Sequence, residues 1–449
     1  MNTDLVTRYE IKVPRYTSYP TAPHFSAAVD ESIFRGWLGA QDPATRLSLY
    51  FHIPFCAAMC WYCGCYTKIV NRYEPVAEYL TALLREIDLA ADALPGRFTA
   101  NHLHWGGGSP TMLTGEDWLR IVDHLRTRFD FDDDAEIAVE ADPRTATEDY
   151  ISALAAAGVN RVSIGVQDFE LDVQQAVNRV QPFEVTKRVI DWLRGYGIDR
   201  INLDLMYGLP LQTRERVIAM ADKALTLRPD RIALFGYAHV PWMKPHQRLI
   251  PEKSLPDTAA RWEQFNAVSE RLVEAGYVAI GLDHFALPDD QLCVAQMEGR
   301  LHRNFQGYTV DTASALIGFG ASAISSLSQG YAQNASPIGA YRKSAMAGHL
   351  PIVRGVAIDG EDRLRGTVIE RLMCDLNVDL DALCISHGKP DDHFRDEIKT
   401  LNPLQADGVI RIDGGKISVT DEGRPLVRLV AAAFDRHLDK GEARYSKAV

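Results

Sequence analysis

The sequence predicts an α/β fold in which strand–helix units repeat and close into a partial (β/α)6 barrel. Short apolar runs with strand character alternate with longer segments of helical periodicity, and the alternation repeats six times. Strict alternation implies parallel strands joined by right-handed crossovers. An open α/β sheet or a full barrel also fits this pattern, and the number of units favours an incomplete barrel.

The expected strands lie between residues 47 and 235. They are Leu47–Ile53, His102–Trp105, Glu136–Glu140, Arg161–Val166, Ile201–Met206 and Ile232–Phe235. Helices are expected between them, at Glu74–Leu94, Glu116–Phe129, Thr147–Ala157, Val185–Tyr196 and Arg214–Leu227.

Polar or glycine-rich residues follow every expected strand. In order, the segments are HIPFCAAMCWYCGC, WGGGSP, VEADPR, GVQDF, LDLMYGLP and Tyr237-Ala238-His239. In barrels of parallel strands the carboxyl ends of the strands carry the active site. Ordinary turn and cap residues explain any one segment, but they explain the whole set poorly. The sequence therefore predicts an active site at this rim.

Three parts are expected along the chain: an N-terminal segment at 1–40 that covers the active site, a catalytic domain at 41–358 and a small, mainly helical C-terminal domain at 359–449. The six units occupy about 46–240 of the catalytic domain. In the C-terminal part, VIRI-DGGK-ISV predicts a hairpin, and a helix is expected at Asp421–His437. This part can form a winged helix, but without a basic face we expect a lid or packing module.

Composition excludes several classes of function. The net charge is −12, which disfavours nucleic acid and anionic lipid as partners. The N-terminal segment MNTDLVTRYEIKVPRYTSYP lacks an apolar stretch of signal-peptide length, and no run of about eighteen apolar residues occurs in the sequence. We expect a cytoplasmic protein that binds no membrane, and a monomer fits its 449 residues.

Four of the seven cysteines fall within ten residues, directly after the first expected strand. Cys56, Cys60 and Cys63 have the spacing Cys-x-x-x-Cys-x-x-Cys, which lets three thiolates hold a [4Fe-4S] cluster whose fourth iron stays open. Structural zinc usually takes four closed ligands in two separated pairs, and no second pair is present. A single-cluster electron carrier is the other alternative. The isolated Cys293, Cys374 and Cys384 are expected to pack in the core.

This cysteine loop, with the aromatic Tyr62 before Cys63, resembles the radical S-adenosylmethionine superfamily. The resemblance implies a TIM-like partial barrel of the radical SAM type. It also implies that the open iron binds the methionine part of S-adenosylmethionine, and that cleavage yields a 5′-deoxyadenosyl radical.

Longer blocks resemble the oxygen-independent coproporphyrinogen III oxidases. The blocks are PRYTSYPTA, YFHIPFC with CWYCGC, HWGGGSPT, GVQDF with VNR, NLDLMYGLP, YAHVP, GLDHFALPDD and LHRNFQGYT. They imply decarboxylation of two propionates of coproporphyrinogen III to vinyl groups, with two S-adenosylmethionine molecules and a one-electron donor such as flavodoxin or ferredoxin. No block is recognised in the C-terminal ninety residues. A haem chaperone of the same superfamily is the nearest alternative, but it generally lacks the RYTSYP segment and the fourth cysteine, and both are present here.

The resemblance assigns cofactor-binding roles residue by residue. Gly107 and Gly108 let backbone approach the methionine moiety, although a tight turn explains them equally well. Glu140 and Asp204 are expected to bind the methionine ammonium or the ribose hydroxyls. Arg179 is expected to bind a carboxylate, with a helix salt bridge as the alternative. Tyr62 and the positions Tyr50, Ser109, Gln167, Ala238 and Ile324 rest on the resemblance alone, and Ser109 stands where threonine is common.

Further residues are expected to act on the substrate. Cys65 matches a fourth cysteine of the family and is expected to be functional without holding iron. Tyr16, Tyr19 and Gln306 are expected to cover or position the tetrapyrrole, and Arg15 or Arg303 to bind its propionates. Packing is the alternative for each. No role is assigned to His52, His239, His284 and His302.

Overall fold

The computed structural model describes residues 8, 9 and 11–438 and divides into two compact units. The first unit consists of residues 25–204 and 311–357. The second consists of residues 205–310, 358–438 and the described part of 1–24. The boundary falls inside strand β7 (Arg200–Tyr207), so this strand contributes its first residues to one unit and its last residues to the other. None of the described helices is long and apolar enough to cross a membrane.

The first unit is built on a sheet whose central strands are parallel. These strands are β1 (Leu47–Ile53), β4 (Thr99–Gly107), β5 (Asp130–Ala141) and β6 (Arg161–Gln167). Each pairs in parallel with the next. On its other edge, β1 pairs in parallel with β13 (Ala315–Phe319). Antiparallel strands then extend the sheet, namely β14 (Ile324–Leu327), β15 (Gly330–Asn334) and β16 (Ile352–Ala357).

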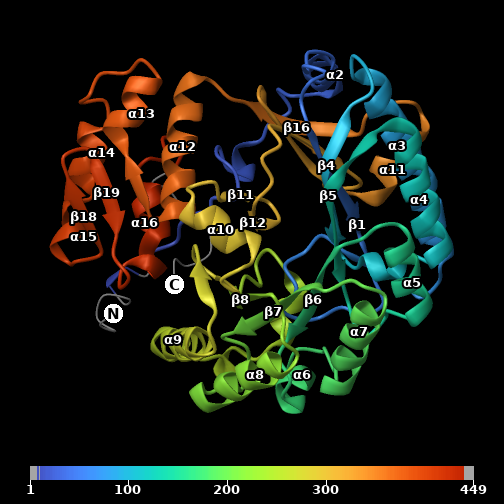
Figure 1. Cartoon of the computed structure of the whole chain (residues 1–449), viewed down its shortest axis with the longest axis horizontal. Coiled ribbons are helices and arrows are strands. Elements are labelled where there is room, and N and C mark those ends of the chain that lie inside the picture. The colour runs from blue at the N-terminus through green and yellow to red at the C-terminus, as the bar shows by residue number, and fades with distance from the viewer. Residues whose placement is uncertain (1–7, 10, 439–449) are drawn as a thin grey trace. The chain divides into compact units, whose positions relative to one another are not determined.

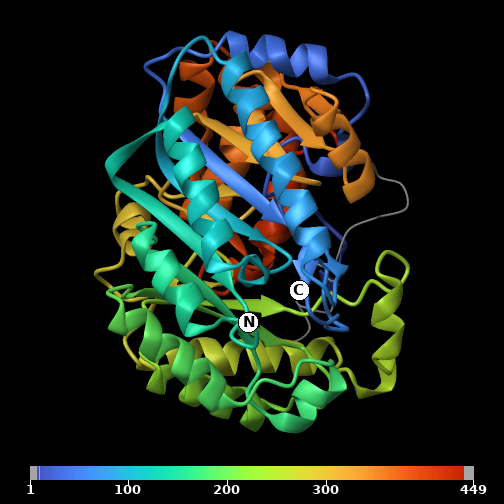
Figure 2. The ribbon, with the colours of Figure 1, turned by 90° about the vertical axis from the view of Figure 1, so that its right-hand side faces the viewer.

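Helices connect the parallel strands, as the sequence predicts. They are α3 (Glu74–Ala93), α4 (Gly115–Arg128), α5 (Glu148–Ala156), α6 (Leu171–Ala176) and α7 (Phe183–Gly195). Figures 1 and 2 show α3 and α4 running along one side of β1 and β4. The unit also contains α2 (Glu31–Gly39) and α11 (Ile338–Met346).

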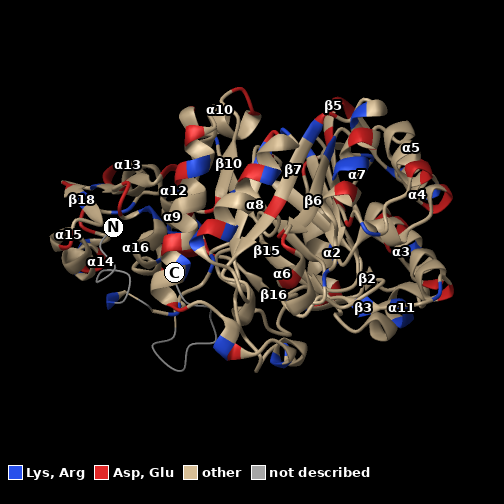
Figure 3. Ribbon diagram, turned by 90° about the horizontal axis from the view of Figure 1, so that it is seen from below, with Lys and Arg blue, Asp and Glu red and all other residues tan. Residues whose placement is uncertain are grey.

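Aromatic rings fill the layer between β1, β4 and α4. The Phe51 ring stacks on Trp105 at 4.0 Å between centroids and on Phe319 at 5.2 Å, and Trp105 lies 4.5 Å from Trp118. Exposed positions of α4 carry charges of both signs, and Arg120 pairs with Asp117 there. Figure 3 colours the charged residues on the ribbon. The apolar face of α4 therefore packs on the sheet, and its charged face is exposed to solvent.

The second unit takes up the chain at the end of β7. Strand β8 (Arg231–Gly236) pairs antiparallel with β10 (His284–Ala286), which pairs antiparallel with β9 (Val278–Ile280). The helices of this segment are α8 (Arg214–Thr226), α9 (Thr258–Glu274) and α10 (Gln291–Met297). A short hairpin follows, formed by β11 (His302–Asn304) and β12 (Gly307–Thr309).

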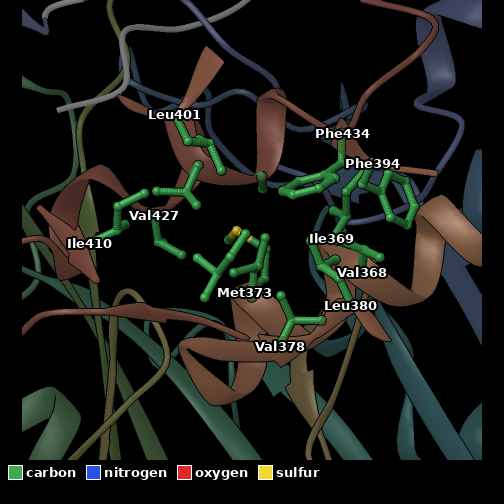
Figure 4. Close-up of a cluster of buried hydrophobic side chains, with 14 of the residues drawn as sticks. Val368, Ile369, Met373, Val378, Leu380, Phe394, Leu401, Ile410, Val427 and Phe434 are labelled. Carbon is green, nitrogen blue, oxygen red and sulfur yellow. The ribbon is translucent and has the colours of Figure 1, made fainter. Parts of the chain in front are cut away.

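The C-terminal part of this unit is mainly helical, as expected. Its elements are α12 (Gly360–Asp375), β17 (Asn377–Asp379), α13 (Leu380–Ser386), α14 (Arg395–Thr400), α15 (Asn402–Ala406), β18 (Ile410–Asp413), β19 (Lys416–Val419) and α16 (Val427–Ala432). The hairpin β18–β19 confirms the one predicted around DGGK. Buried side chains of these elements and of the segments that join them, among them Met373, Phe394 and Phe434, meet in one apolar cluster (Figure 4).

The predicted helix at Asp421–His437 is wrong in extent. Turn residues and a 3-10 turn at Arg424–Leu426 come first, and α16 ends at Ala432. Pro425 lacks an N–H and is tolerated only near the start of a helix. The backbone at Gly423 approaches the Val409 carbonyl so closely that an added Cβ would lie 2.0 Å from that oxygen. The segment before Val427 is therefore held as a turn.

Candidate active site

The cysteine segment forms a loop that is closed at its base. The short strands β2 (Phe55–Cys56) and β3 (Lys68–Ile69) pair in parallel. The N–H of Lys68 donates to the Pro54 carbonyl at 2.7 Å, and the N–H of Val70 donates to the Cys56 carbonyl at 3.1 Å. These bonds bring the two ends of the loop together directly after β1, where the sequence predicts the site.

The far side of the loop is tied to the turn after α6. The N–H of Trp61 donates to the Val177 carbonyl at 2.9 Å. The side-chain amide of Asn178 donates to the Met59 carbonyl at 2.7 Å. Asn178 has φ 54°, a left-handed conformation that asparagine tolerates better than most residues. The loop is thus fixed from two directions before any cofactor binds.

Each of the three predicted ligand thiols accepts a hydrogen bond. The Thr67 hydroxyl donates to Cys56 Sγ at 3.1 Å. The backbone N–H of Cys65 donates to Cys63 Sγ at 3.4 Å. Two guanidinium groups, from Arg144 and Arg179, reach Cys60 Sγ at 3.5 and 3.6 Å. Hydrogen bonds to cluster sulfurs are a means by which proteins set the reduction potential of an iron–sulfur cluster.

Asp142 holds the two arginines beside Cys60. It pairs with Arg144 at 2.6 Å and with Arg179 at 3.3 Å. Burial alone would raise the pKa of Asp142, but the charges of Arg179 and Arg144 lower it. Arg179 also donates from Nη2 to the Gly165 carbonyl at 2.5 Å. Arg179 thus makes a salt bridge, as its structural alternative expects, but the partner lies on the loop after β5 and not on a helix.

This donor set fits an iron–sulfur cluster. Burial, together with the nearby Cys63 and Cys60 thiols, raises the pKa of Cys56 to about 11, while the Thr67 hydroxyl lowers it. Cluster binding would therefore be coupled to loss of the thiol proton. The hydrogen bond with Cys63, and then desolvation by the surrounding atoms, raise the pKa of Cys65, although part of this residue is exposed at the surface. Among the described residues, no three His, Cys, Asp or Glu side chains converge on a position for a single metal ion.

The three glycines at the end of β4, Gly106 and Gly107 within the strand and Gly108 directly after it, are required by their neighbours. A Cβ on Gly106 would lie 2.5 Å from Oε1 of Glu140, and one on Gly107 would lie 2.5 Å from the His52 ring. Gly107 also has φ 111°, which side chains rarely adopt. A Cβ on Gly108 would meet the Phe55 carbonyl at 2.7 Å. The glycines therefore bring the backbone against the base of the cysteine loop and the Glu140 carboxylate.

Glu140 lies at the centre of a polar group on β1, β4 and β5. It accepts hydrogen bonds from the Gly107 N–H and from His104, both at 3.2 Å. Burial would raise the pKa of Glu140, but these bonds and the charge of His104 lower it, so the carboxylate stays ionised. Tyr50 stacks on His104 and contacts Nδ1 of His52 at 3.2 Å. An ionised carboxylate beside exposed backbone suits the binding of an ammonium group.

Gln167 ends β6, and Asp204 lies within β7, three residues before its end. Gln167 has φ 72°, and its buried Oε1 has no hydrogen-bond partner among the described residues. Strained backbone and an unsatisfied buried acceptor are both features that cluster at binding sites. Asp204 accepts hydrogen bonds from Ser163 at 3.2 Å and from the amide of Asn202 at 2.8 Å. Both residues thus stand where the sequence places cofactor ligands.

Three other predicted cofactor residues of this unit have visible neighbours in the structure. The Ser109 hydroxyl lies 2.5 Å from that of Thr111, which lies 2.7 Å from that of Thr145, so it belongs to a buried chain of hydroxyls. Ile324 begins β14, and its carbonyl lies where a Cβ of Gly318 would fall. Tyr62 is close enough to Arg179 for their charges to interact, and burial raises its pKa.

The remaining predicted residues belong to the second unit. Tyr16 and Tyr19 are buried in the C-terminal apolar cluster, where the Tyr16 hydroxyl donates to Asp435 at 3.1 Å and the Tyr19 hydroxyl accepts from the Arg436 N–H at 3.0 Å. Gln306 lies in the turn of the β11–β12 hairpin, and Ala238 lines a cavity after β8. Their substrate and cofactor roles stay predictions.

Sequence reasoning missed several residues of the site. They are His52, Thr67, His104, Asp142 and Arg144. Two of them could have been predicted from the sequence. Asp142 and Arg144 follow an expected strand directly, in the segment VEADPR, and the active site is predicted at the ends of these strands. His52 and His104 share a face with Tyr50 and Gly106, two residues away on the same strands.

Comparisons with known proteins match two segments of the chain. Residues 50–224 match the radical SAM superfamily, and residues 358–426 match the HemN C-terminal domain. The second match covers the C-terminal region, where the sequence itself shows no recognisable family block.

Whole-chain relatives share one name. The chain is 49% identical to the oxygen-independent coproporphyrinogen III oxidase of Bradyrhizobium diazoefficiens, with 100% of both chains covered. It is 40% identical to the protein of that name from Pseudomonas aeruginosa, covering 99% of this chain and 98% of the relative. Its structure matches the Escherichia coli coproporphyrinogen III oxidase HemN, described as a radical SAM enzyme, with a TM-score of 0.92 and 39% identity over 97% of this chain and 99% of that one.

Proposed function

The chain belongs to the family of oxygen-independent coproporphyrinogen III oxidases, and on that premise we propose how its residues share the work of the reaction. The protein is a radical SAM enzyme that decarboxylates two propionates of coproporphyrinogen III to vinyl groups and gives protoporphyrinogen IX. Each propionate loses one hydrogen atom, one CO2 and one further electron. The observation that carries the assignment is the closed loop in which three thiols each accept a hydrogen bond.

Cys56, Cys60 and Cys63 would hold the [4Fe-4S] cluster and leave one iron open. When bound, the reduced cluster supplies the electron that cleaves S-adenosylmethionine into methionine and the radical that takes hydrogen from the substrate. Arg144 and Arg179 place positive charge beside Cys60, which stabilises the extra negative charge of the reduced state. Cys65 contributes its N–H to Cys63 and is assigned a functional role without iron ligation.

The polar groups beside the loop would bind S-adenosylmethionine. Glu140 is ionised and suits the methionine ammonium, and Gly107 and Gly108 offer backbone without side chains in the way. Gln167 supplies an acceptor that its own surroundings leave unsatisfied. Arg179 and Asp204 suit a carboxylate and ribose hydroxyls respectively. Two cofactor molecules are proposed, one for each propionate, and they would also contact Tyr50, Tyr62, Ser109, Ala238 and Ile324.

The proposal also covers the electron donor, the cellular location and the oligomeric state of the protein. The cluster needs a one-electron donor, such as flavodoxin or ferredoxin, and we propose a cytoplasmic monomer. Tyr16, Tyr19 and Gln306 would position the tetrapyrrole from the N-terminal segment and from the β11–β12 hairpin.

An anaerobic assay tests the function directly. The reconstituted protein is incubated with coproporphyrinogen III, dithionite and S-adenosylmethionine, and porphyrins are separated after oxidation. We expect protoporphyrin IX, with 5′-deoxyadenosine formed in the same reaction. A Cys63→Ser variant should form neither product, whereas Cys293→Ser, at a buried position outside the loop, serves as the matched control.

The haem-chaperone alternative predicts a different result. It would give tight haem binding and no protoporphyrin with the wild-type protein. A plain electron carrier would show a reduced-cluster EPR spectrum that does not change when S-adenosylmethionine is added. Either result would contradict the proposed function.

A further inference from the structure

The second unit contains a cavity of about 410 Å³ at the carboxyl ends of β7 and β8. Aromatic side chains form much of its wall, among them Tyr207, Phe235, Tyr237, Trp262 and Phe265. Flat apolar walls of this kind bind flat or ring-shaped ligands, and the volume is in the range of small-molecule sites.

The charged residues of this cavity are mostly cations. They come from four separate parts of the chain and are Lys12, Arg15, Arg261, Arg303 and Arg428. Its two acids already have partners. Asp257 caps α9 by accepting from the Ala260 N–H, and Asp283 accepts from His284 at 2.7 Å. The lining therefore carries an excess of positive charge.

Arg261 is held in place by the ends of two strands. Its Nη1 donates to the Tyr237 carbonyl at 2.8 Å, and its guanidinium lies over the Tyr207 ring at 5.5 Å. A Cβ on Gly208 would lie 2.3 Å from Nη1, and one on Gly236 would lie 3.2 Å from Nη2. Glycine at both strand ends thus makes room for this one side chain, which is a feature of a prepared binding group.

Arg303 and Arg428 place further charge on the cavity. Nε and Nη1 of Arg303 are buried and lack a hydrogen-bond partner among the described residues, while its guanidinium covers the Tyr308 ring at 4.5 Å. Arg428 on α16 is 4% exposed. Burial and the nearby charges of Arg15 and Arg303 lower the pKa of Arg428 to about 9. Buried like charges repel one another, so a bound anion would relieve this arrangement.

We propose that this cavity binds the carboxylates of the substrate, with Arg261, Arg303 and Arg428 as propionate-binding residues and the aromatic wall against the macrocycle. The inference rests on the proposed function, because that function supplies a ring-shaped substrate with four carboxylates. Cations on several sides of an aromatic cavity suit such a molecule better than they suit a compact anion such as phosphate, which would engage only one side.

Porphyrin binding by the full-length, cluster-reconstituted protein tests the assignment. The probes are coproporphyrin III, with four carboxylates, and deuteroporphyrin IX, with two, and binding is followed by fluorescence. We expect the wild type to prefer coproporphyrin III. Arg261→Met and Arg303→Met should each weaken coproporphyrin III binding about ten- to a hundredfold, as loss of a charge-assisted pair does. Both variants should also lower the ratio of the affinity for coproporphyrin III to the affinity for deuteroporphyrin IX. Arg303→Lys keeps the positive charge and should bind coproporphyrin III more tightly than Arg303→Met does.

The control is Arg411→Met, which removes an exposed arginine on β18 that does not line the cavity and should leave both affinities unchanged. The inference is overturned if the wild type binds both probes equally, if the cavity variants bind coproporphyrin III as the wild type does, or if they lose affinity for both probes to the same extent. Decarboxylation of coproporphyrinogen III by the wild type is measured in parallel and tests the proposed function separately. The enzyme can decarboxylate the substrate whether or not these three arginines bind its carboxylates, so failure of the inference and failure of the proposed function can be told apart.

Discussion

Replacing Arg144 by methionine should lower the reduction potential of the cluster. The guanidinium lies 3.5 Å from Cys60 Sγ, so its charge is roughly 6 Å from the bound cluster when the length of an iron–sulfur bond is added. At an effective dielectric constant of about 20, that charge stabilises one added electron by about 3 kcal/mol. Since 1.4 kcal/mol corresponds to about 59 mV for one electron, the upper limit of the shift is roughly 120 mV.

Two features of the site set the sign and reduce the size of this shift. Removing a positive charge disfavours the more negative, reduced cluster, so the potential must become more negative. Asp142 stays paired with Arg179 at 3.3 Å after the substitution, so no new carboxylate is left beside the cluster unpaired. Relaxation of the remaining Arg179 toward Cys60 would recover part of the loss. We therefore expect a decrease of roughly 50 to 100 mV.

An EPR-monitored redox titration under anaerobic conditions measures the shift. Arg144→Lys keeps the charge and should move the potential less than Arg144→Met. Arg120→Met removes an exposed arginine that pairs with Asp117 on α4 and should leave the potential unchanged. An unchanged or more positive potential in Arg144→Met, with full iron content, would refute the electrostatic reasoning.

Three further predictions concern single residues. Cys65→Ala should keep its iron content, measured per protein after reconstitution, whereas Cys63→Ala should lose most of it. Gly106→Ala places a Cβ 2.5 Å from Glu140 Oε1, so S-adenosylmethionine binding, measured by equilibrium dialysis, should weaken about tenfold or more as the carboxylate is displaced. Burial raises the pKa of Glu86 from 4.5 to about 7 despite three hydrogen bonds, so the folded state keeps a proton that the unfolded chain loses. Its contribution to stability is therefore lost as pH rises from about 4.5 to 7, and Glu86→Gln should flatten that decline in chemical unfolding.

The central strands were predictable because each is a short apolar run with its own turn after it. Strand β1 has the predicted bounds, β6 is one residue longer at its end, and β7 is one residue longer at each end. Strands β13 to β16 were not predicted. They pair with one another and, through β13, with β1, a strand about 270 residues earlier. Periodicity shows that a segment is apolar, but it does not show which distant strand provides its partner.

The cluster ligands were predictable for a similar reason, since their chemistry is complete within eight residues of sequence. The groups that act on the thiols are not local. Thr67 reaches Cys56 because β2 and β3 pair, and Arg144 reaches Cys60 from the loop after β5. The cavity of the second unit shows the same limit. Arg15 and Arg303 stand in recognised blocks, whereas Arg261 and Arg428 became visible only when the chain was folded.

Arg179 shows how a residue that is predictable from the sequence depends on residues that only the folded structure brings close to it. Its Nη1 is shared between Asp142 and Cys60, and its Nη2 is bonded to the Gly165 carbonyl, so the buried Nε is the donor without a partner among the described residues. If Arg179 binds a cofactor carboxylate through Nη1, it gives up part of its pair with Asp142. Arg144 makes that exchange possible, because it keeps the Asp142 carboxylate neutralised at 2.6 Å. A residue that sequence reasoning missed is therefore what allows the predicted role of Arg179 without leaving a buried carboxylate unpaired.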